Sequence, residues 1–244
     1  MVMFDIIVVG GGHAGIEASL VGARLGMRVL LVTMRTDMVG QMSCNPAIGG
    51  LAKGHLVLEV DALGGEIGKL ADATAIQYRM LNIGKGPAVW SPRTQNDRKK
   101  YKDVSQEVIK NEMNIELVEA EAQALILDKD RVVGVRTQDR KEFYSKATII
   151  TTGTFLKGLI HVGLESFAGG RLGETEASNL PHSFCKCGLF LGRLKTGTSP
   201  RISGKTIDFS ELKIQTGDEH PFPFSFRTQE VRIEQLPCHI THTN

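Results

Sequence analysis

Long apolar runs, aromatic residues and an excess of charge of one sign are all scarce in this 244-residue chain. A membrane-spanning helix needs about 18 consecutive apolar residues, and no apolar run in the chain approaches that length, so we expect no membrane association. The net charge of +2 is too small to indicate nucleic-acid binding by itself. The chain opens directly into an apolar strand without a secretory signal pattern, which predicts a cytoplasmic protein.

Cysteine is also scarce, with four residues in the whole chain. In a reducing compartment they are expected to be thiols rather than disulfides. Cys185 and Cys187 lack the second pair that a zinc site requires, and they are interpreted as ordinary surface or packing residues. The sequence therefore predicts no metal site. With 41% hydrophobic and 23% charged residues, the composition is that of a globular protein of one large or two small domains.

A glycine fingerprint stands close to the N-terminus. Gly10, Gly12 and Gly15 have the G-x-G-x-x-G spacing, and the apolar run 6–9 comes directly before them. A helical apolar pattern and a second strand at 28–33 follow. Glycines at this spacing let the chain turn sharply, bring the backbone close to a pyrophosphate and pack the helix on the sheet. The free N–H groups of the helix N-terminus then face the phosphates.

The position after the second strand departs from the general pattern. Dinucleotide sites usually place an acidic residue there to hold the ribose hydroxyls. Here Thr33, Met34 and Arg35 stand at this point, and the first acid is Asp37. The fingerprint therefore predicts a dinucleotide without choosing between FAD and NAD. Ribose recognition is expected from elsewhere, such as the hydroxyl or backbone of Thr33.

The order of the other predicted elements indicates the fold class. Seven glycines lie between residues 40 and 68, and this density suggests a backbone pressed against a flat ligand. A helix is predicted over 55–63, with Leu56, Val60 and Leu63 on one face, and another over 101–111. Polar breaks at 128–130 and 138–140 predict hairpin turns. We predict an α/β, Rossmann-like domain with an inserted antiparallel β-meander, from strands at 115–120, 124–128, 131–137, 141–144 and 147–151.

Two segments carry dense positive charge. Residues 85–102 hold six basic side chains against one acidic, and residues 186–205 hold five and no acid. The second contains a glycine- and hydroxyl-bearing loop over 192–201 that can hold phosphate or carboxylate groups. A solvated basic surface is the alternative interpretation of this loop.

Several long motifs together resemble the MnmG (GidA) family. The resemblance covers residues 4–244, essentially the whole chain, and is far more specific than the glycine fingerprint. The segments that carry it are Val9-Gly-Gly-Gly-His-Ala-Gly15, Gln41-Met-Ser-Cys-Asn-Pro-Ala-Ile-Gly-Gly50, Lys53-Gly-His-Leu56, Lys85-Gly-Pro-Ala-Val89, Gly153-Thr-Phe-Leu156, Arg193-Leu-Lys-Thr-Gly-Thr198 and Thr241-His-Thr243.

The resemblance implies an activity and its cofactors. The family consists of FAD-dependent enzymes of the glutathione-reductase fold type that modify the wobble uridine of tRNA. They use NADH and methylenetetrahydrofolate, work with an MnmE-type GTPase and act as homodimers. The FAD contacts that the resemblance implies are Gly10, Gly11, Gly12, His13, Ala14, Gly15, Ala122 and Ala177.

Cys44 matches a family cysteine implicated in catalysis. A thiolate is suited to attack carbon 6 of a uracil, which makes carbon 5 nucleophilic. A buried structural cysteine is the alternative. Asn45, Lys53, Arg193 and Lys195 are the further candidates for binding substrate or phosphate.

The chain also departs from the family pattern. Family members are much longer, and their second cysteine and NAD-binding stretch would lie beyond Asn244. We therefore expect an incomplete FAD-binding domain over 1–200 and the start of an inserted substrate or NAD domain over 201–244. Trp90 stands where a basic residue is usual, and residues 174–177 replace a proline-rich version.

Two other functions stay open. One is a folate- and FAD-dependent tRNA uracil methyltransferase, a family that shares the fold and the chemistry. The other is a truncated, non-catalytic module that binds a nucleotide or RNA through the two basic segments. RNA affinity that falls steeply with salt would favour this second function.

Overall fold

The computed structural model describes residues 3–177 and 179–242. It contains two compact units, and the chain passes between them three times. The first unit is Met1–Gln41 with Lys102–Lys195, and the second is Met42–Tyr101 with Thr196–Asn244. The sequence did not predict that 42–101 groups with 196–244, because no local signal links the two segments. The assignment of 1–200 as an FAD-binding domain stays a prediction.

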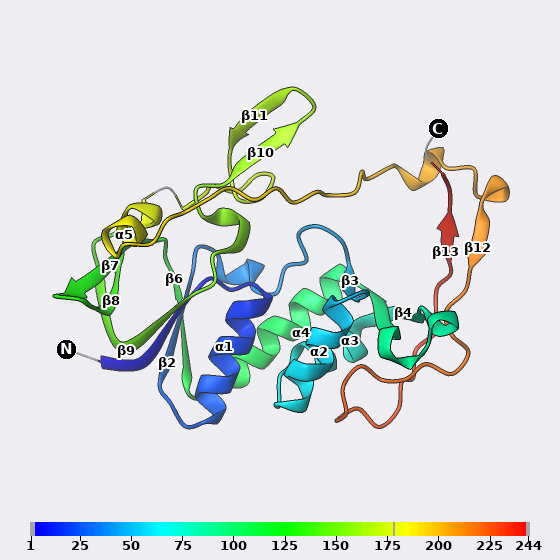
Figure 1. Ribbon diagram of the computed structural model, residues 1–244, viewed down its shortest axis with the longest axis horizontal. Coiled ribbons are helices and arrows are strands. Elements are labelled where there is room, and N and C mark those ends of the chain that lie inside the picture. The colour runs from blue at the N-terminus through cyan, green and yellow to red at the C-terminus, as the bar shows by residue number, and fades with distance from the viewer. Residues whose placement is uncertain (1–2, 178, 243–244) are drawn as a thin grey trace. The chain divides into compact units, whose positions relative to one another are not determined.

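A six-stranded sheet forms the centre of the first unit (Figure 1). Its order is β6-β2-β1-β9-β8-β7, in which β6, β2, β1 and β9 are parallel and β8 and β7 continue as an antiparallel meander. The predicted α/β fold with a meander is therefore confirmed. The strands are β1 (Met3–Val9), β2 (Val29–Thr33), β6 (Ile115–Glu119), β7 (Ala122–Asp128), β8 (Arg131–Thr137) and β9 (Glu142–Ile150).

Helices cover both faces of this sheet, because successive side chains of its buried strands point to opposite sides. Val8 and Leu31 pack against α1 (His13–Arg24) and against Ile109 of α4 (Arg98–Asn111). Ile7 and Leu30 face the other way, toward α5 (Leu180–Lys186). The buried parts of β1 and β2 are therefore continuous apolar runs.

Strand β9 corrects one sequence prediction. The segments 141–144 and 147–151 were predicted as separate strands, but they form one strand that pairs antiparallel with β8 and parallel with β1. The polar residues between them do not interrupt the pairing, since Ser145 is paired with Phe4 of β1. The Ser145 hydroxyl also donates a hydrogen bond to Ala147 O at 2.9 Å. The predicted turns are confirmed, and Lys129 and Arg140 adopt positive φ in them. After β9, a hairpin of β10 (Leu159–Val162) and β11 (Glu165–Ala168) extends away from the sheet (Figure 1).

The second unit is built on a three-stranded antiparallel sheet of order β3-β5-β4. Its strands are β3 (Ala47–Gly49), β4 (Ala75–Leu81) and β5 (Ser91–Asn96), and its helices are α2 (Lys53–Ala62) and α3 (Ile67–Thr74). Asn96 Nδ2 donates to Ala71 O at 2.8 Å and so joins β5 to α3. A short pair of β12 (Lys213–Gln215) and β13 (Cys238–Ile240) completes the unit.

The face of α2 that packs inward differs from the predicted one. The helix is confirmed, but Leu56, Val60 and Leu63 are exposed, and Leu63 is 87% exposed. Val57 and Asp61 are buried instead. Asp61 turns inward because it accepts a hydrogen bond from Phe226 N at 2.8 Å and forms an ion pair with Arg227 at 3.2 Å. A distant polar partner therefore overrides the apolar periodicity of α2.

Two buried carboxylates hold the segment 222–227 to the helices of the second unit. Asp72 of α3 accepts hydrogen bonds from Phe224 N at 2.7 Å, from Ser225 N at 2.9 Å and from the hydroxyl of Tyr78 at 2.7 Å. Asp61 accepts from Phe226 N and from the guanidinium of Arg227. Because these backbone N–H groups have no secondary-structure partner, the carboxylates satisfy donors that would otherwise be costly to bury.

Candidate functional site

The turn from β1 into α1 leaves no room for side chains at two of its glycines. Gly10 has φ of +110°, and a Cβ there would lie 2.5 Å from Thr151 O. A Cβ on Gly15 would collide with the carbonyl oxygen of Gly10. The turn is also tied to the neighbouring strand, because Thr151 Oγ1 donates to Gly10 O at 3.0 Å. The close approach of backbone atoms of Thr151 to Gly10, and of Gly10 to Gly15, therefore fixes the shape of this turn.

Gly12 is the exception among the fingerprint glycines. It is exposed, its φ of −78° suits any residue, and a Cβ there would meet no protein atom within 4 Å. Packing within the protein therefore does not require a glycine here, whereas close approach of a pyrophosphate does. Gly12 is the N-cap of α1, whose first turn has no acidic residue to oppose an anion.

The edge of the sheet beside this turn carries a carboxylate that the sequence analysis missed. Glu119 ends β6 and pairs in register with Thr33, the last residue of β2. Its Oε2 accepts hydrogen bonds of 2.8 Å from both the backbone N–H and the hydroxyl of Thr36, which lower the pKa of Glu119. An acid is thus fixed next to the end of β2, where the chain itself has none. Only the parallel pairing of β2 and β6 reveals it.

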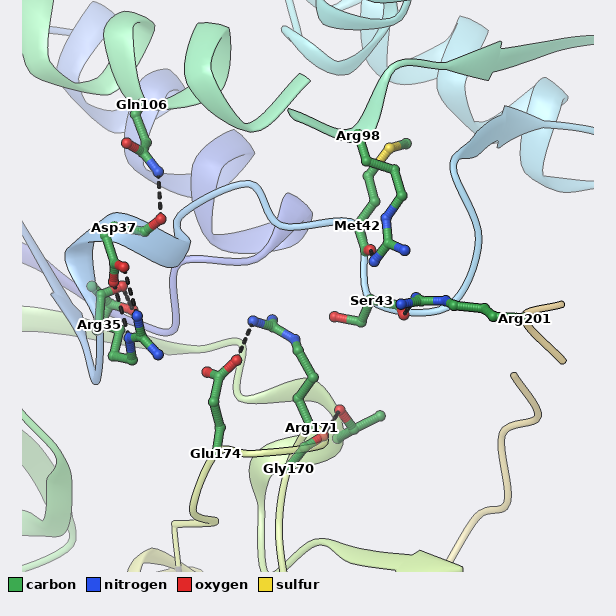
Figure 2. Close-up of polar contacts among 12 residues, drawn as sticks. Arg35, Asp37, Met42, Ser43, Arg98, Gln106, Gly170, Arg171, Glu174 and Arg201 are labelled. Atoms are coloured by element: carbon green, nitrogen blue, oxygen red, sulfur yellow. Dashed lines mark hydrogen bonds and ion pairs between the residues drawn. The ribbon is translucent and has the colours of Figure 1, made fainter. Parts of the chain in front are cut away.

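The loop after β2 is ordered by charge pairs on the first unit (Figure 2). Arg35 makes a two-point contact with Asp37, at 3.0 Å and 2.6 Å, and this guanidinium lowers the pKa of Asp37. Gln106 of α4 donates to Asp37 O at 2.7 Å. Arg171 and Glu174 form a separate ion pair at 2.7 Å. Arg35 is therefore already paired and does not offer an uncompensated charge.

Ala122 and Ala177 lie in the same unit as the glycine turn, and both are buried. Ala122 opens β7 with its methyl group in the apolar core. Ala177 N donates to Phe155 O at 2.8 Å, and Ala177 O accepts from Lys157 N at 3.0 Å. Since the side chain of Ala122 is enclosed by other residues, a cofactor contact there would use backbone atoms.

The loop that carries Cys44 belongs to the second unit and is held by two arginines (Figure 2). Arg98 donates to Met42 O at 2.5 Å, and Arg201 donates to Ser43 O at 3.4 Å. Both arginines come from the basic segments singled out in the sequence, but nothing in the sequence linked them to this loop. Their positive charges lie next to the residues that lead into Cys44.

Cys44 and Lys53 interact electrostatically. Cys44 is partly exposed and free, and Lys53 begins α2. The ammonium group of Lys53 donates to Ala47 O at 3.0 Å. Desolvation lowers the pKa of Lys53, and the charge of a Cys44 thiolate acts in the opposite direction. The structure therefore brings a cation and the sulfur of the candidate cysteine within electrostatic range.

The other candidate residues are less enclosed. Asn45 is exposed directly after Cys44. Arg193 and Lys195 lie in a segment without helix or strand, and every residue from 185 to 206 is exposed. Within the described part of the chain, neither of the two forms an ion pair. The structure therefore places Lys53 near Cys44, but it does not bring Arg193 and Lys195 into a formed pocket.

Cys185 and Cys187 are free and exposed. Across residues 3–177 and 179–242, no cluster of three or more histidine, cysteine or acidic side chains is arranged to hold a metal ion. In the same residues, no helix combines the length and the apolar character needed to cross a bilayer.

Comparison with known proteins gives close matches. The model of the family described as glucose inhibited division protein A matches residues 5–244. The tRNA uridine 5-carboxymethylaminomethyl modification enzyme MnmG of Nitratiruptor sp. is 52% identical over 99% of this chain and 39% of that protein. The structure of Aquifex aeolicus GidA is 46% identical with a TM-score of 0.93, over 98% of this chain and 41% of that one.

A more distant structure shares the fold alone. The GidA-related protein from Thermus thermophilus is 21% identical, with a TM-score of 0.53 over 75% of this chain and 68% of that chain. The chain spans about two fifths of the length of the curated relatives it matches.

Proposed function

Because the chain belongs to the glucose inhibited division protein A family, we propose that it carries the FAD cradle of an enzyme that modifies the wobble uridine of tRNA. The proposed product carries a carboxymethylaminomethyl or aminomethyl group on carbon 5 of that uridine. One observation supports the cradle above all: Gly12 is a glycine that the packing of the protein does not require.

The residues of the first unit fit a dinucleotide. The turn from Gly10 to Gly15 would hold the pyrophosphate through the N–H groups that follow Gly10, whose own N–H donates to Val32 O at 2.8 Å. His13 and Ala14 begin the helix that faces it. Glu119 would accept hydrogen bonds from the ribose hydroxyls in place of the acid missing after β2. Backbone atoms of Ala122 and Ala177 would hold the adenine end. A bound flavin supplies electron transfer, and these residues supply binding and orientation.

Cys44 is the proposed nucleophile. Its thiolate sulfur forms a bond to carbon 6 of the uracil, and the electron pair of the C5–C6 double bond moves toward carbon 5 and the O4 carbonyl. Carbon 5 can then bond to the methylene carbon of the folate, and one of the carbon–nitrogen bonds of that carbon breaks, its electron pair leaving with the nitrogen. Loss of the proton on carbon 5 and expulsion of the sulfur restore the double bond. Lys53 would stabilise the thiolate, and Asn45, Arg193 and Lys195 would contact the substrate or its phosphates.

The co-substrates and partners of the proposed enzyme follow from the family relation. Methylenetetrahydrofolate would supply the one-carbon unit and NADH the reducing electrons. An MnmE-type GTPase would act with the protein, which would form a homodimer in the cytoplasm. Within such an enzyme, residues 1–200 would belong to the FAD-binding domain and 201–244 would begin a second domain.

Two measurements test the proposal. The purified chain is incubated with FAD and desalted, and a retained flavin absorbance band is the expected result. The chain, alone and within the longer protein that the proposal implies, is then supplied with methylenetetrahydrofolate, NADH, the GTPase and tRNA lacking the wobble modification. Mass spectrometry of the tRNA nucleosides is expected to show the modified wobble uridine only when the longer protein is used.

The outcomes separate the alternatives. Retained flavin without any uridine product would refute the reaction and leave the cofactor assignment standing. A methyl group on a uridine of the T-loop would establish the methyltransferase instead. Salt-dependent RNA binding without flavin would point to the non-catalytic module.

A further inference from the structure

The connection between β4 and β5 displays the single tryptophan of the chain. Trp90 lies at the end of this connection, and 41% of the residue is exposed. Its indole Nε1 donates a hydrogen bond to Ile83 O at 3.0 Å, and its backbone N–H donates to Pro87 O at 3.1 Å. The polar edge of the ring is therefore satisfied within the protein, and what remains exposed is apolar ring surface.

Internal hydrogen bonds and tight turns hold the connection. Asn82 begins it in the left-handed region with φ of 62°, and its Nδ2 donates to Val89 O at 3.3 Å. Gly86 has φ of 94°, and short 3₁₀ turns stand on either side of it at Ile83–Lys85 and Pro87–Val89. A ring held in this way loses little conformational freedom when a partner stacks on it, which favours binding.

The hairpin below this connection carries two arginines side by side. Arg79 of β4 and Arg93 of β5 are paired in register. Tyr78 and Asn96 point toward α3, since both bond to it, so the alternation of the strands places Arg79 and Arg93 on the opposite face. Like charges directly across a strand pair destabilise the sheet. An anion that binds both guanidinium groups would offset this repulsion.

Neither guanidinium is neutralised within the described residues. No carboxylate lies within ion-pair distance of Arg79 or Arg93 among residues 3–177 and 179–242. Arg79 donates one hydrogen bond, to Thr216 O at 2.8 Å, and a guanidinium has five donors. Lys85 adds an exposed positive charge in the connection itself. One hairpin thus carries an exposed aromatic ring and three basic side chains.

We propose that this hairpin binds a single-stranded nucleotide of the RNA substrate, with one base stacked on Trp90 and phosphates held by Arg79, Arg93 and Lys85. The inference rests on the proposed function and assigns an RNA contact to residues of the second unit. An RNA strand fits better than a protein partner, because the cations have no acidic counterpart and the ring offers a stacking face.

The chain permits a direct test, because Trp90 is its only source of tryptophan fluorescence. The purified chain is titrated with a short single-stranded oligouridylate and, in parallel, with an abasic strand of the same length and charge. The expected result is saturable quenching by the oligouridylate and little quenching by the abasic strand. Equal quenching by the two strands, or none by either, would overturn the proposal.

Variants test each part separately, with affinity measured from the anisotropy of labelled RNA. Trp90→Ala is expected to weaken binding by about tenfold, whereas Trp90→Phe keeps a stacking ring and most of the affinity. Arg93→Gln is expected to reduce the slope of log affinity against log salt by about 0.7 for each lost phosphate contact. Circular dichroism checks that each variant is folded. Unchanged affinity in folded Trp90→Ala would refute the stacking.

This result is independent of the outcome for the proposed reaction. If the modified uridine forms but Trp90 takes no part in RNA binding, the proposed function stands and this inference fails. If Trp90 stacks on RNA but no flavin is retained and no product forms, the RNA surface stands and the reaction fails.

Discussion

At the scale of single residues, the glycines of the β1–α1 turn are constrained by different neighbours. The carbonyl oxygen of Gly10 occupies the space of a side chain at Gly15, whereas Gly12 faces no protein atom. The same motif therefore contains a glycine needed for folding and one needed for the ligand. Two single substitutions can separate these roles.

We predict that Gly15→Ala destabilises the protein and Gly12→Ala does not. A methyl group at position 15 forces the turn apart, so the free energy of unfolding should fall by about 2 kcal/mol or more. At position 12 the backbone already suits alanine, and the change should stay within about 0.5 kcal/mol. Urea denaturation measures both.

Flavin binding supplies the second readout for this pair. Gly12→Ala should retain the fold but bind FAD at least about tenfold more weakly, because its methyl group meets the pyrophosphate. Wild-type affinity in Gly12→Ala would show that no phosphate approaches this turn.

We predict that the free energy of unfolding falls at alkaline pH because of Tyr78. Burial and the hydrogen bond to Asp72 raise the pKa of Tyr78 above the value of 10.0 that it has when unfolded. Above pH 10 the unfolded chain loses this proton while the folded chain keeps it, so stability falls by up to about 1.4 kcal/mol per pH unit. Below pH 10 the contribution is complete.

Tyr78→Phe is the variant that isolates this effect. It lacks the titrating hydroxyl, so it should be less stable than wild type at pH 8 by about 1 kcal/mol and lose less stability above pH 10. Urea unfolding at several pH values measures the difference. If the difference in unfolding free energy between wild type and Tyr78→Phe stays constant from pH 8 to pH 11, the raised pKa of Tyr78 is contradicted.

Residues that act through a local motif are the ones that the sequence predicts. Gly10, Gly12 and Gly15 fall within six positions, and their constraints are visible in the spacing. Glu119 is 83 positions from Thr36, and its role depends on which strand lies beside β2. The same holds for Arg201, which lies 158 positions from Ser43. Such contacts are set by topology and leave no periodic trace in the chain.

At the scale of secondary-structure elements, α2 shows how polar anchoring changes the buried face. Its apolar periodicity favoured Leu56, Val60 and Leu63, but the bonds of Asp61 turn the opposite side inward. Helix propensity and length were predictable, whereas orientation depended on a partner from 226–227. The exposed leucines therefore contribute little to the core.

A matched pair of truncations on α2 tests this orientation. Val57→Ala removes two methyl groups from a buried site and should cost about 1–3 kcal/mol of unfolding free energy. Leu56→Ala removes more atoms from an exposed site and should change stability by less than about 0.5 kcal/mol. Thermal denaturation of both variants shows which one loses more stability. A larger loss in Leu56→Ala would mean that the face predicted from the sequence is the buried one.

The strands of the second unit were missed for a physical reason. β5 has the sequence Ser-Pro-Arg-Thr-Gln-Asn, which contains no apolar alternation. It is stabilised instead by buried polar contacts, such as Thr94 Oγ1 to Asn96 Oδ1 at 2.8 Å and Ser91 Oγ to Gly50 O. β3 has three residues, which is too short for a pattern. In the first unit, β1 and β2 contain apolar runs, and segments of all four parallel strands were predicted.

At the scale of the whole molecule, the second unit contains two segments that are far apart in the chain. Residues 196–242 are held to 42–101 by hydrogen bonds such as Gln77 Nε2 to Gln215 O at 3.0 Å and Met80 N to Asp218 at 2.6 Å. The chain reaches them through the fully exposed stretch 185–206. Continuity of the chain is therefore not what keeps this segment in place.

Limited trypsin digestion should show this directly. Arg193 and Lys195 lie in exposed, irregular chain, which proteases cleave first. The fragment that begins near residue 196 should then co-elute with the rest of the protein in gel filtration and separate only in denaturant. Its release from the nicked protein in native buffer would contradict the described packing.

The pairing of β1 with β9 has a consequence for synthesis on the ribosome. β1 is the first strand made, and the residues with which it pairs on one side, from Tyr144 to Ile150, lie about 140 positions later. At about 5–20 residues per second, translation needs roughly 7–28 s to supply them. Throughout that time β1 can pair only with β2 and keeps an open apolar edge. Nascent chains of this protein should therefore depend on chaperones until the ninth strand emerges and closes the sheet.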